Sequence, residues 1–130
     1  MQSIGKTSFK NAIAVSALAA GIFLGSASVA HAQAAESGQA VFQQHCGMCH
    51  NMAKNGIGPN LSGVVGRKAG KAAGFAYSPA LAKSGLTWTR AKLDAFLAAP
   101  QSVVPRTRMP IMTPDAGQRK SIISFLANRK

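Results

Sequence analysis

The sequence is poor in acidic residues. It contains three Asp and Glu residues against fifteen Lys and Arg residues, which gives the 130-residue chain a formal net charge of +12. A surplus of this size exceeds what solubility requires and indicates an acidic partner, such as a protein face, an anionic membrane or nucleic acid. The chain has no basic run interleaved with aromatic residues, a pattern typical of single-strand binding. Nucleic acid is therefore the least favoured of the three partners.

The sequence also lacks the alternation of apolar and polar residues that indicates strands, and it has no internal repeat. Residues 51–77 are rich in glycine and predict a long loop. Helices are expected on both sides of this loop. The first helix is expected to be capped by Ser37 and to end near Cys49, and the second to start at Ser78 and Pro79 and stop at Gly85. A third should start at Thr89 and end at Pro100, and the last should be capped by Thr113 with Pro114 as its first residue.

The first thirty residues do not have the character of a folded domain. Lys6 and Lys10 form a basic start, residues 11–30 carry no charge, and alanines at A-x-A spacing follow. This order is typical of a secretory signal peptide. We predict a cleaved leader over residues 1–32, or a cut after residue 34, and one domain over residues 36–130. A retained membrane anchor is the alternative, because about 20 apolar residues can span a bilayer.

Cysteine is nearly absent too, and the one pair lies in the stretch "QQHCGMCHNM". Free thiols do not persist in the oxidising compartment that export implies, so the pair must have a use. A disulfide between Cys46 and Cys49 would close a very short loop and add little stability. A thioredoxin-like dithiol needs flanking strands. Structural zinc needs four ligands around it, whereas His45, Cys46, Cys49 and His50 all lie within six residues.

The spacing C-x-x-C-H in an exported chain predicts the covalent attachment of one haem c. Cys46 and Cys49 are spaced so that each can form a thioether with one of the two vinyl groups on a haem edge. The next residue, His50, then lies under the ring, where its imidazole can bind the iron. His45 is wrongly placed for this role and is expected at the surface.

A methionine as the second iron ligand raises the reduction potential and is typical of an electron carrier. Met48 and Met52 lie too close to His50 to reach the other side of the ring. The remaining candidates in the predicted domain are Met109 and Met112, in "VPRTRMPIMTP".

Several segments resemble the class I cytochromes c of the mitochondrial and bacterial c2 kind. "GQAVFQQHCGMCH" resembles the first helix and haem site of that family, and "GIGPNLSGVVGRKAG" resembles its G-P-x-L-x-G-x-x-G-R segment. "FAYSPAL" and "LTWT" match its Tyr and Trp, and "VPRTRMP" resembles the P-G-T-K-M segment that delivers the axial sulfur. The resemblance covers residues 36–130. It implies an all-α fold with four or five helices and a long loop around one covalently bound haem, and Met109 as the second ligand.

The resemblance also implies roles around the haem. The backbone carbonyl of Pro59 would accept a hydrogen bond from His50 and so fix the imidazole ring. Tyr77, Trp88 and Arg67 correspond to residues that hydrogen-bond or charge-pair with the haem propionates, since a buried carboxylate needs such donors.

Some residues depart from the family pattern. Arg106 stands where the family usually has glycine, which leaves the course of this loop open. Phe96 replaces a frequent tyrosine and cannot donate a hydrogen bond toward the axial sulfur, and Ser62 replaces a frequent histidine. Lysines that are common in relatives are replaced by His45, Gln101 and Ser102. The basic rim is therefore expected to be partly relocated.

The expected function is that of a soluble, monomeric, periplasmic carrier of single electrons, not an enzyme. Its partners would be acidic docking faces on a bc1-type complex, a terminal oxidase, a dehydrogenase or a photosynthetic reaction centre, with at most peripheral membrane contact and no nucleic acid. The alternative is a haem peroxidase or gas sensor in which the methionine ligand is labile or absent.

Overall fold

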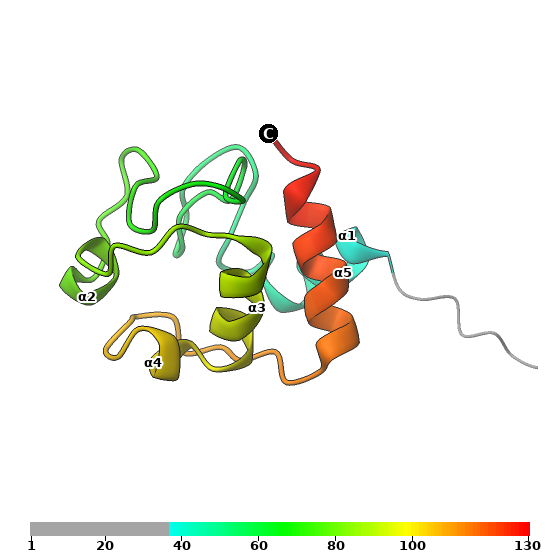
Figure 1. The fold of residues 1–130 in the computed structure, drawn as a ribbon. Coiled ribbons are helices and arrows are strands. Elements are labelled where there is room, and N and C mark those ends of the chain that lie inside the picture. Colours follow the sequence, from blue (N-terminus) through cyan, green and yellow to red (C-terminus); the bar gives the residue numbers. More distant parts are fainter. Residues whose placement is uncertain (1–36) are drawn as a thin grey trace, which may run out of the picture. The chain divides into compact units, whose positions relative to one another are not determined.

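The computed structural model describes residues 37–130, and the predicted leader lies outside these residues. Within this range the chain forms helices and no strand, apart from an isolated antiparallel bridge between Lys68 and Thr87 (Figure 1). None of the helices in this range has both the length and the apolar character needed to cross a bilayer. The helices are α1 (Gly38–His45), α2 (Pro79–Ala82), α3 (Arg90–Ala98), α4 (Pro100–Val103) and α5 (Ala116–Ala127).

The first three predicted helix caps are confirmed. The hydroxyls of Ser37, Ser78 and Thr89 each accept a hydrogen bond from a backbone N–H in the first turn of the helix that follows. This side-chain acceptor satisfies one of the amide groups that a helix start leaves unpaired. The predicted end of α1 is wrong, because the helix stops at His45 rather than near Cys49. The amides of Cys49 and His50 both donate to the carbonyl of Cys46, and the chain turns there.

The predicted start of the last helix is also wrong. The cap of α5 is Asp115, whose carboxylate accepts a hydrogen bond from the amide of Gln118 at 2.7 Å. Thr113 is buried instead, and its amide donates to the carbonyl of Leu97 at 2.8 Å. Asp is a stronger cap than Thr, and the helix begins after Asp115, while Thr113 is held against α3.

Pro100 ends α3 as predicted, but it also begins α4, which the sequence analysis missed. Proline is favoured as the first residue of a helix because its fixed φ suits that position and its missing N–H has no partner there. The single residue between the two helices, Ala99, has an extended φ of −153°. The chain therefore changes direction at Ala99 and carries α4 toward the segment that contains Met109.

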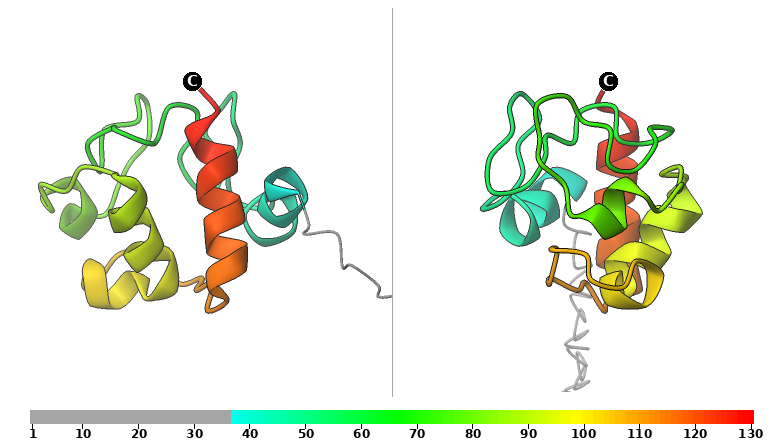
Figure 2. Two further views of the ribbon diagram at one scale, coloured as in Figure 1. Left: turned by 45° about the vertical axis from the view of Figure 1, so that its right-hand side comes forward. Right: turned by 90° about the vertical axis from the view of Figure 1, so that its left-hand side faces the viewer.

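Helix α5 packs against α1 on one side and α3 on the other (Figure 2). The crossing with α1 is close at Gly38, where an added Cβ would meet the backbone oxygen of Ser121 and lie 2.9 Å from the Cβ of Phe125. The rings of Phe42 and Phe125 meet in the same contact, with centroids 5.2 Å apart. The two ends of the described chain are therefore joined by direct helix packing.

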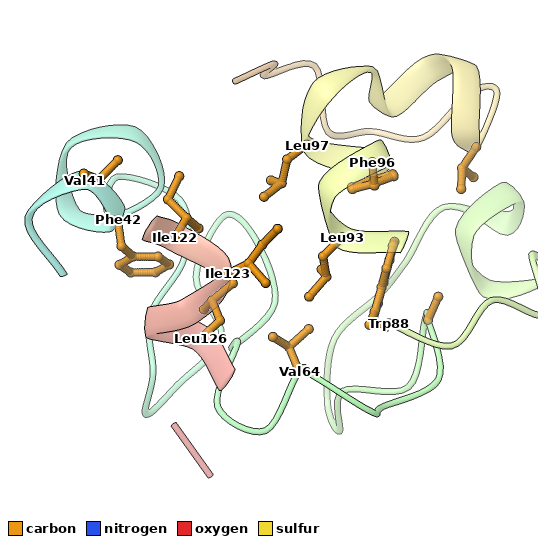
Figure 3. Packing of buried hydrophobic residues seen from close by; sticks show 12 residues of the cluster. Val41, Phe42, Val64, Trp88, Leu93, Phe96, Leu97, Ile122, Ile123 and Leu126 are labelled. Carbon is orange, nitrogen blue, oxygen red and sulfur yellow. The ribbon is translucent and has the colours of Figure 1, made fainter. Parts of the chain in front are cut away.

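The buried apolar side chains form one cluster between these helices and the long loop. Figure 3 shows Phe42 beside Ile122 and Leu126, with Leu93 and Trp88 on the side of α3. Residues 51–77 contain no helix, as predicted. Asn55 braces this loop, because its side chain donates to the carbonyl of Ala73 and accepts from the amide of Asn60, both at 2.9 Å. The loop thus has a fixed course although it has no regular structure.

Candidate functional site

A cleft of about 230 Å³ lies between the long loop, α3, α5 and the segment that joins α4 to α5. Much of its wall is made of buried or half-buried apolar side chains, such as Val64, Leu93 and Leu97. All the residues that the sequence analysis placed in the site line this cleft. They are Cys46, Cys49, His50, Pro59, Arg67, Tyr77, Trp88 and Met109.

The two cysteines are free thiols at the wall of the cleft, and no disulfide joins them. Burial raises the pKa of the Cys46 thiol to about 11, and the neighbouring Cys49 adds to this shift. Within residues 37–130 no three His, Cys, Asp or Glu side chains gather as a metal site would need. The structure thus supports neither the disulfide nor the zinc alternative.

His50 is fixed by a hydrogen bond from its Nδ1 to the carbonyl oxygen of Pro59, at 2.8 Å. Burial lowers the pKa of the imidazole, although the Pro59 carbonyl opposes this shift. A neutral ring that donates from Nδ1 keeps a lone pair on Nε2, which is the form that binds a metal. The hydrogen bond that the family resemblance implied is therefore present.

Gly58 is a site residue that the sequence analysis missed. It is buried, and a Cβ added there would lie 2.7 Å from Nδ1 of His50 and would overlap other atoms of the ring. Glycine is therefore required for the loop to pass against the imidazole. The available signal was its position directly before Pro59 in "GIGPN".

The structure distinguishes between the two methionines that spacing left open. Met109 is half-buried, lines the cleft and packs against the core cluster. Met112 is 61% exposed and is not part of the cleft wall. The placement therefore favours Met109 as the sulfur ligand.

The three residues that the resemblance assigns to the propionates line the cleft and have different hydrogen bonds. The Tyr77 hydroxyl accepts from the amide of Ala72 at 3.2 Å, which leaves its own O–H free to donate. The Arg67 guanidinium donates to the carbonyls of Asn60 and Ser62 at 2.8 and 2.9 Å. The Trp88 amide donates to the carbonyl of Arg67 at 2.9 Å, so the backbones of these two residues are held together.

His45 differs from its expected position. It is half-buried and lines the cleft, and its Nε2 is enclosed without a hydrogen-bond partner among the described residues. The expectation of a surface residue is therefore wrong. His45 is the last residue of α1 and adjoins Cys46, where the chain turns along the cleft, and this accounts for its burial.

The comparison with known proteins agrees with this geometry. The family model described as cytochrome c matches residues 35–130. The chain belongs to the cytochrome c family. As a cytochrome c it is an electron-transfer protein, not an enzyme, and it carries one covalently bound haem c.

Individual relatives support the same assignment. The chain is 46% identical to cytochrome c2 of Rhodoblastus acidophilus over 99 residues, which covers 73% of this chain and 92% of that protein. Among solved structures, cytochrome cH from Methylobacterium extorquens has a TM-score of 0.68 and 47% identity, over 71% of this chain and 95% of that one. Ferricytochrome c2 from Rhodopseudomonas palustris has a TM-score of 0.68 and 40% identity, over 74% and 98% of the two chains. The predicted fold and family are thus confirmed.

The residues of the cleft fit the haem of a cytochrome c. They provide an apolar wall, two thiols at C-x-x-C spacing, a neutral imidazole and a thioether sulfur. An apolar cleft of about 230 Å³ leaves its lining exposed to water, and a bound haem would cover these side chains and so stabilise the fold.

The departures from the family pattern leave the fold of this cytochrome c intact. Arg106 adopts a φ of +65°, so an arginine takes the left-handed backbone that glycine favours. Phe96 is buried and packs its ring against Trp88, with centroids 4.9 Å apart. The loop before Met109 therefore keeps a turn that suits glycine although no glycine is present.

Proposed function

We propose that this cytochrome c is a soluble periplasmic carrier of single electrons whose haem iron is held by His50 and Met109. One observation carries the proposal: both side chains line the cleft that also contains Cys46 and Cys49, although the segments lie far apart in the sequence. When it is bound, the haem supplies an iron centre that gains and loses one electron.

The residues of the chain hold this group and limit what can reach it. Cys46 and Cys49 would fasten the haem edge, and the Pro59 carbonyl orients His50. With Met109 as the second ligand, no coordination position would remain for a substrate. The apolar wall excludes water and disfavours the extra positive charge of the oxidised centre, which raises the potential.

Tyr77, Trp88 and Arg67 would serve the propionates of the haem. The support is that all three line the cleft, that the Tyr77 O–H is free to donate, and that the backbone pairs Trp88 with Arg67. Donors of this kind offset the cost of placing carboxylates in an apolar cleft.

The leader predicted over residues 1–32 would direct the protein to the periplasm, where this cytochrome c would act as a monomer. Relatives such as cytochrome c2 of Rhodoblastus acidophilus support a c2-like role. The positive charge of the chain would steer it to acidic docking faces on a bc1-type complex, a terminal oxidase, a dehydrogenase or a reaction centre.

The axial ligand is tested with Met109→Ala and, as a matched control, Met112→Ala. We expect Met109→Ala to lose the weak red absorption band of a sulfur–iron bond and to have a lower midpoint potential. Met112→Ala should keep the band and the potential, because Met112 is exposed and lies outside the cleft wall. Optical spectra and redox titration of the purified holoprotein give both readouts. A Met109→Ala protein with the unchanged band and potential, or a high-spin spectrum of the native protein, would rule out the assignment.

A further inference from the structure

The turn before Met109 has a backbone angle that arginine rarely adopts. Arg106, at φ +65°, is the one non-glycine residue with positive φ in the part of the chain that the structure describes. Pro105 precedes it, and the amide of Thr107 donates to the carbonyl of Val104 at 3.0 Å. These features are those of a type II turn, in which the third position favours glycine because a Cβ is strained there. Arginine at this position therefore needs support from the surrounding structure.

The side chain of Gln101, on α4, supplies that support. Its Oε1 accepts a hydrogen bond from the amide of Arg106 at 3.0 Å, and its Nε2 donates to the carbonyl of Thr107 at 2.8 Å. One side chain therefore holds the N–H of Arg106 and the C=O of the residue after it. A carboxamide carries a donor and an acceptor in the required positions, whereas glutamate offers only acceptors and lysine only donors.

The same turn leads directly to the cleft. Thr107 is buried and lines the cleft, and its Oγ1 lies 3.5 Å from the amide of Met109, which donates to it. Arg108, between Thr107 and Met109, links this segment to the long loop on another side of the cleft, because its guanidinium donates to the carbonyl of Ala76 at 2.7 Å. The position of Met109 thus depends on the turn before it, and Gln101 binds the last two residues of that turn, Arg106 and Thr107.

We propose that Gln101 is a positioning residue for the sulfur of Met109. Its side chain binds the N–H of Arg106 and the C=O of Thr107. These two hydrogen bonds keep Arg106 in the left-handed conformation and keep Met109 at the cleft. Two departures from the family pattern are then related. Arg106 replaces a glycine and strains the turn, and Gln101 replaces a frequent lysine and stabilises that turn. The inference rests on the proposed role of Met109 as the iron ligand.

The test is a titration of the oxidised holoprotein with imidazole, which competes with Met109 for the iron. Gln101→Ala loses both hydrogen bonds, so it should bind imidazole roughly fivefold to tenfold more tightly than the parent. Gln101→Glu keeps an acceptor for the Arg106 amide and loses only the bond to the Thr107 carbonyl, so its affinity should rise by a smaller factor. Ser102→Ala is the matched control, since Ser102 is the exposed neighbour on α4. It should titrate like the parent.

A second background separates positioning from a general loss of stability. In an Arg106→Gly protein the turn needs no brace, so Gln101→Ala should change the imidazole affinity by less than about twofold. If a Gln101 variant of the parent fails to mature, recovery of holoprotein in the Arg106→Gly background supports the proposal, and equal failure in both backgrounds overturns it.

The outcomes also separate this inference from the proposed function. Parent-like imidazole affinity in both Gln101 variants, with the red band lost in Met109→Ala, overturns the role of Gln101 and leaves the ligand assignment intact. An equal effect of Gln101→Ala in the parent and in the Arg106→Gly background overturns it as well. A red band that persists in Met109→Ala overturns the ligand assignment itself.

Discussion

Gly58 lies so close to the His50 ring that no side chain fits at position 58. Because an added Cβ at Gly58 would overlap the imidazole, we expect Gly58→Ala to push the ring away from its hydrogen bond with Pro59. Overpacking of this kind costs about 1–3 kcal/mol. The expected result is a lower yield of holoprotein, an altered low-spin spectrum and a lower midpoint for unfolding in urea.

Gly56→Ala is the matched control in the same loop. Its Cβ would lie 3.3 Å from the carbonyl of Cys49, a contact that a small shift relieves, and the residue is exposed. It should therefore keep the spectrum and lose less stability. A Gly58→Ala protein as stable as Gly56→Ala would show that the loop can move away from the ring.

At the scale of single residues, C-x-x-C-H predicted Cys46, Cys49 and His50 as haem-binding residues, and the resemblance implied Met109. The structure brings these four residues to the wall of one cleft. The bond between Gln101 and Arg106 and the contact of Gly58 with His50 could not be predicted from spacing, because each depends on how a loop turns in space. His45 was misplaced for the same reason, since its burial follows from the turn after α1.

At the scale of helices, the crossing of α1 and α5 depends on the missing side chain of Gly38. Helix propensity alone predicts that Gly38→Ala stabilises the protein, by up to about 1 kcal/mol. Packing predicts the opposite, because the new Cβ would meet the backbone of Ser121 and the Cβ of Phe125. We expect packing to dominate and the variant to be destabilised by about 1–3 kcal/mol in urea unfolding.

The control for this prediction is Gly117→Ala in the first turn of α5. Gly117 is exposed, and the nearest atom to an added Cβ is a carboxylate oxygen of Asp115 at 3.1 Å. This oxygen also accepts the capping hydrogen bond from the amide of Gln118, so a small shift would weaken the cap, and we expect the stability to change by less than about 1 kcal/mol, which is less than at Gly38. A gain in stability for Gly38→Ala would mean that the two helices separate without cost.

Helix limits show what local patterns can and cannot specify. Ser37, Ser78 and Thr89 were identified from the sequence because a cap acts within its own first turn. Thr113 is also a cap by residue type, although a weaker one than Asp. Its amide is bound to the carbonyl of Leu97 of α3, and a contact between distant segments is not visible in a local pattern. Helix α4 was missed because Pro100 was interpreted only as an end.

At the scale of the whole molecule, the surplus of Lys and Arg should control encounters with charged partners. The full chain has a net charge of +12, which is +10 without the predicted leader that contains Lys6 and Lys10. The second-order rate of oxidation by a small anionic complex should therefore fall roughly tenfold between low and high salt. Stopped-flow measurements on the holoprotein give this rate. A cationic oxidant is the control, and its rate should rise with salt. The same direction of change with both oxidants would show that charge does not steer the encounter.

Neither of the two acidic side chains among residues 37–130 is free. The Asp94 carboxylate accepts from Nε of Arg119 at 2.7 Å, and the Asp115 carboxylate caps α5. What stays available to solvent is mainly a set of lysines and arginines. The described part of the molecule thus holds no unengaged carboxylate side chain that would repel a negatively charged neighbour at close range.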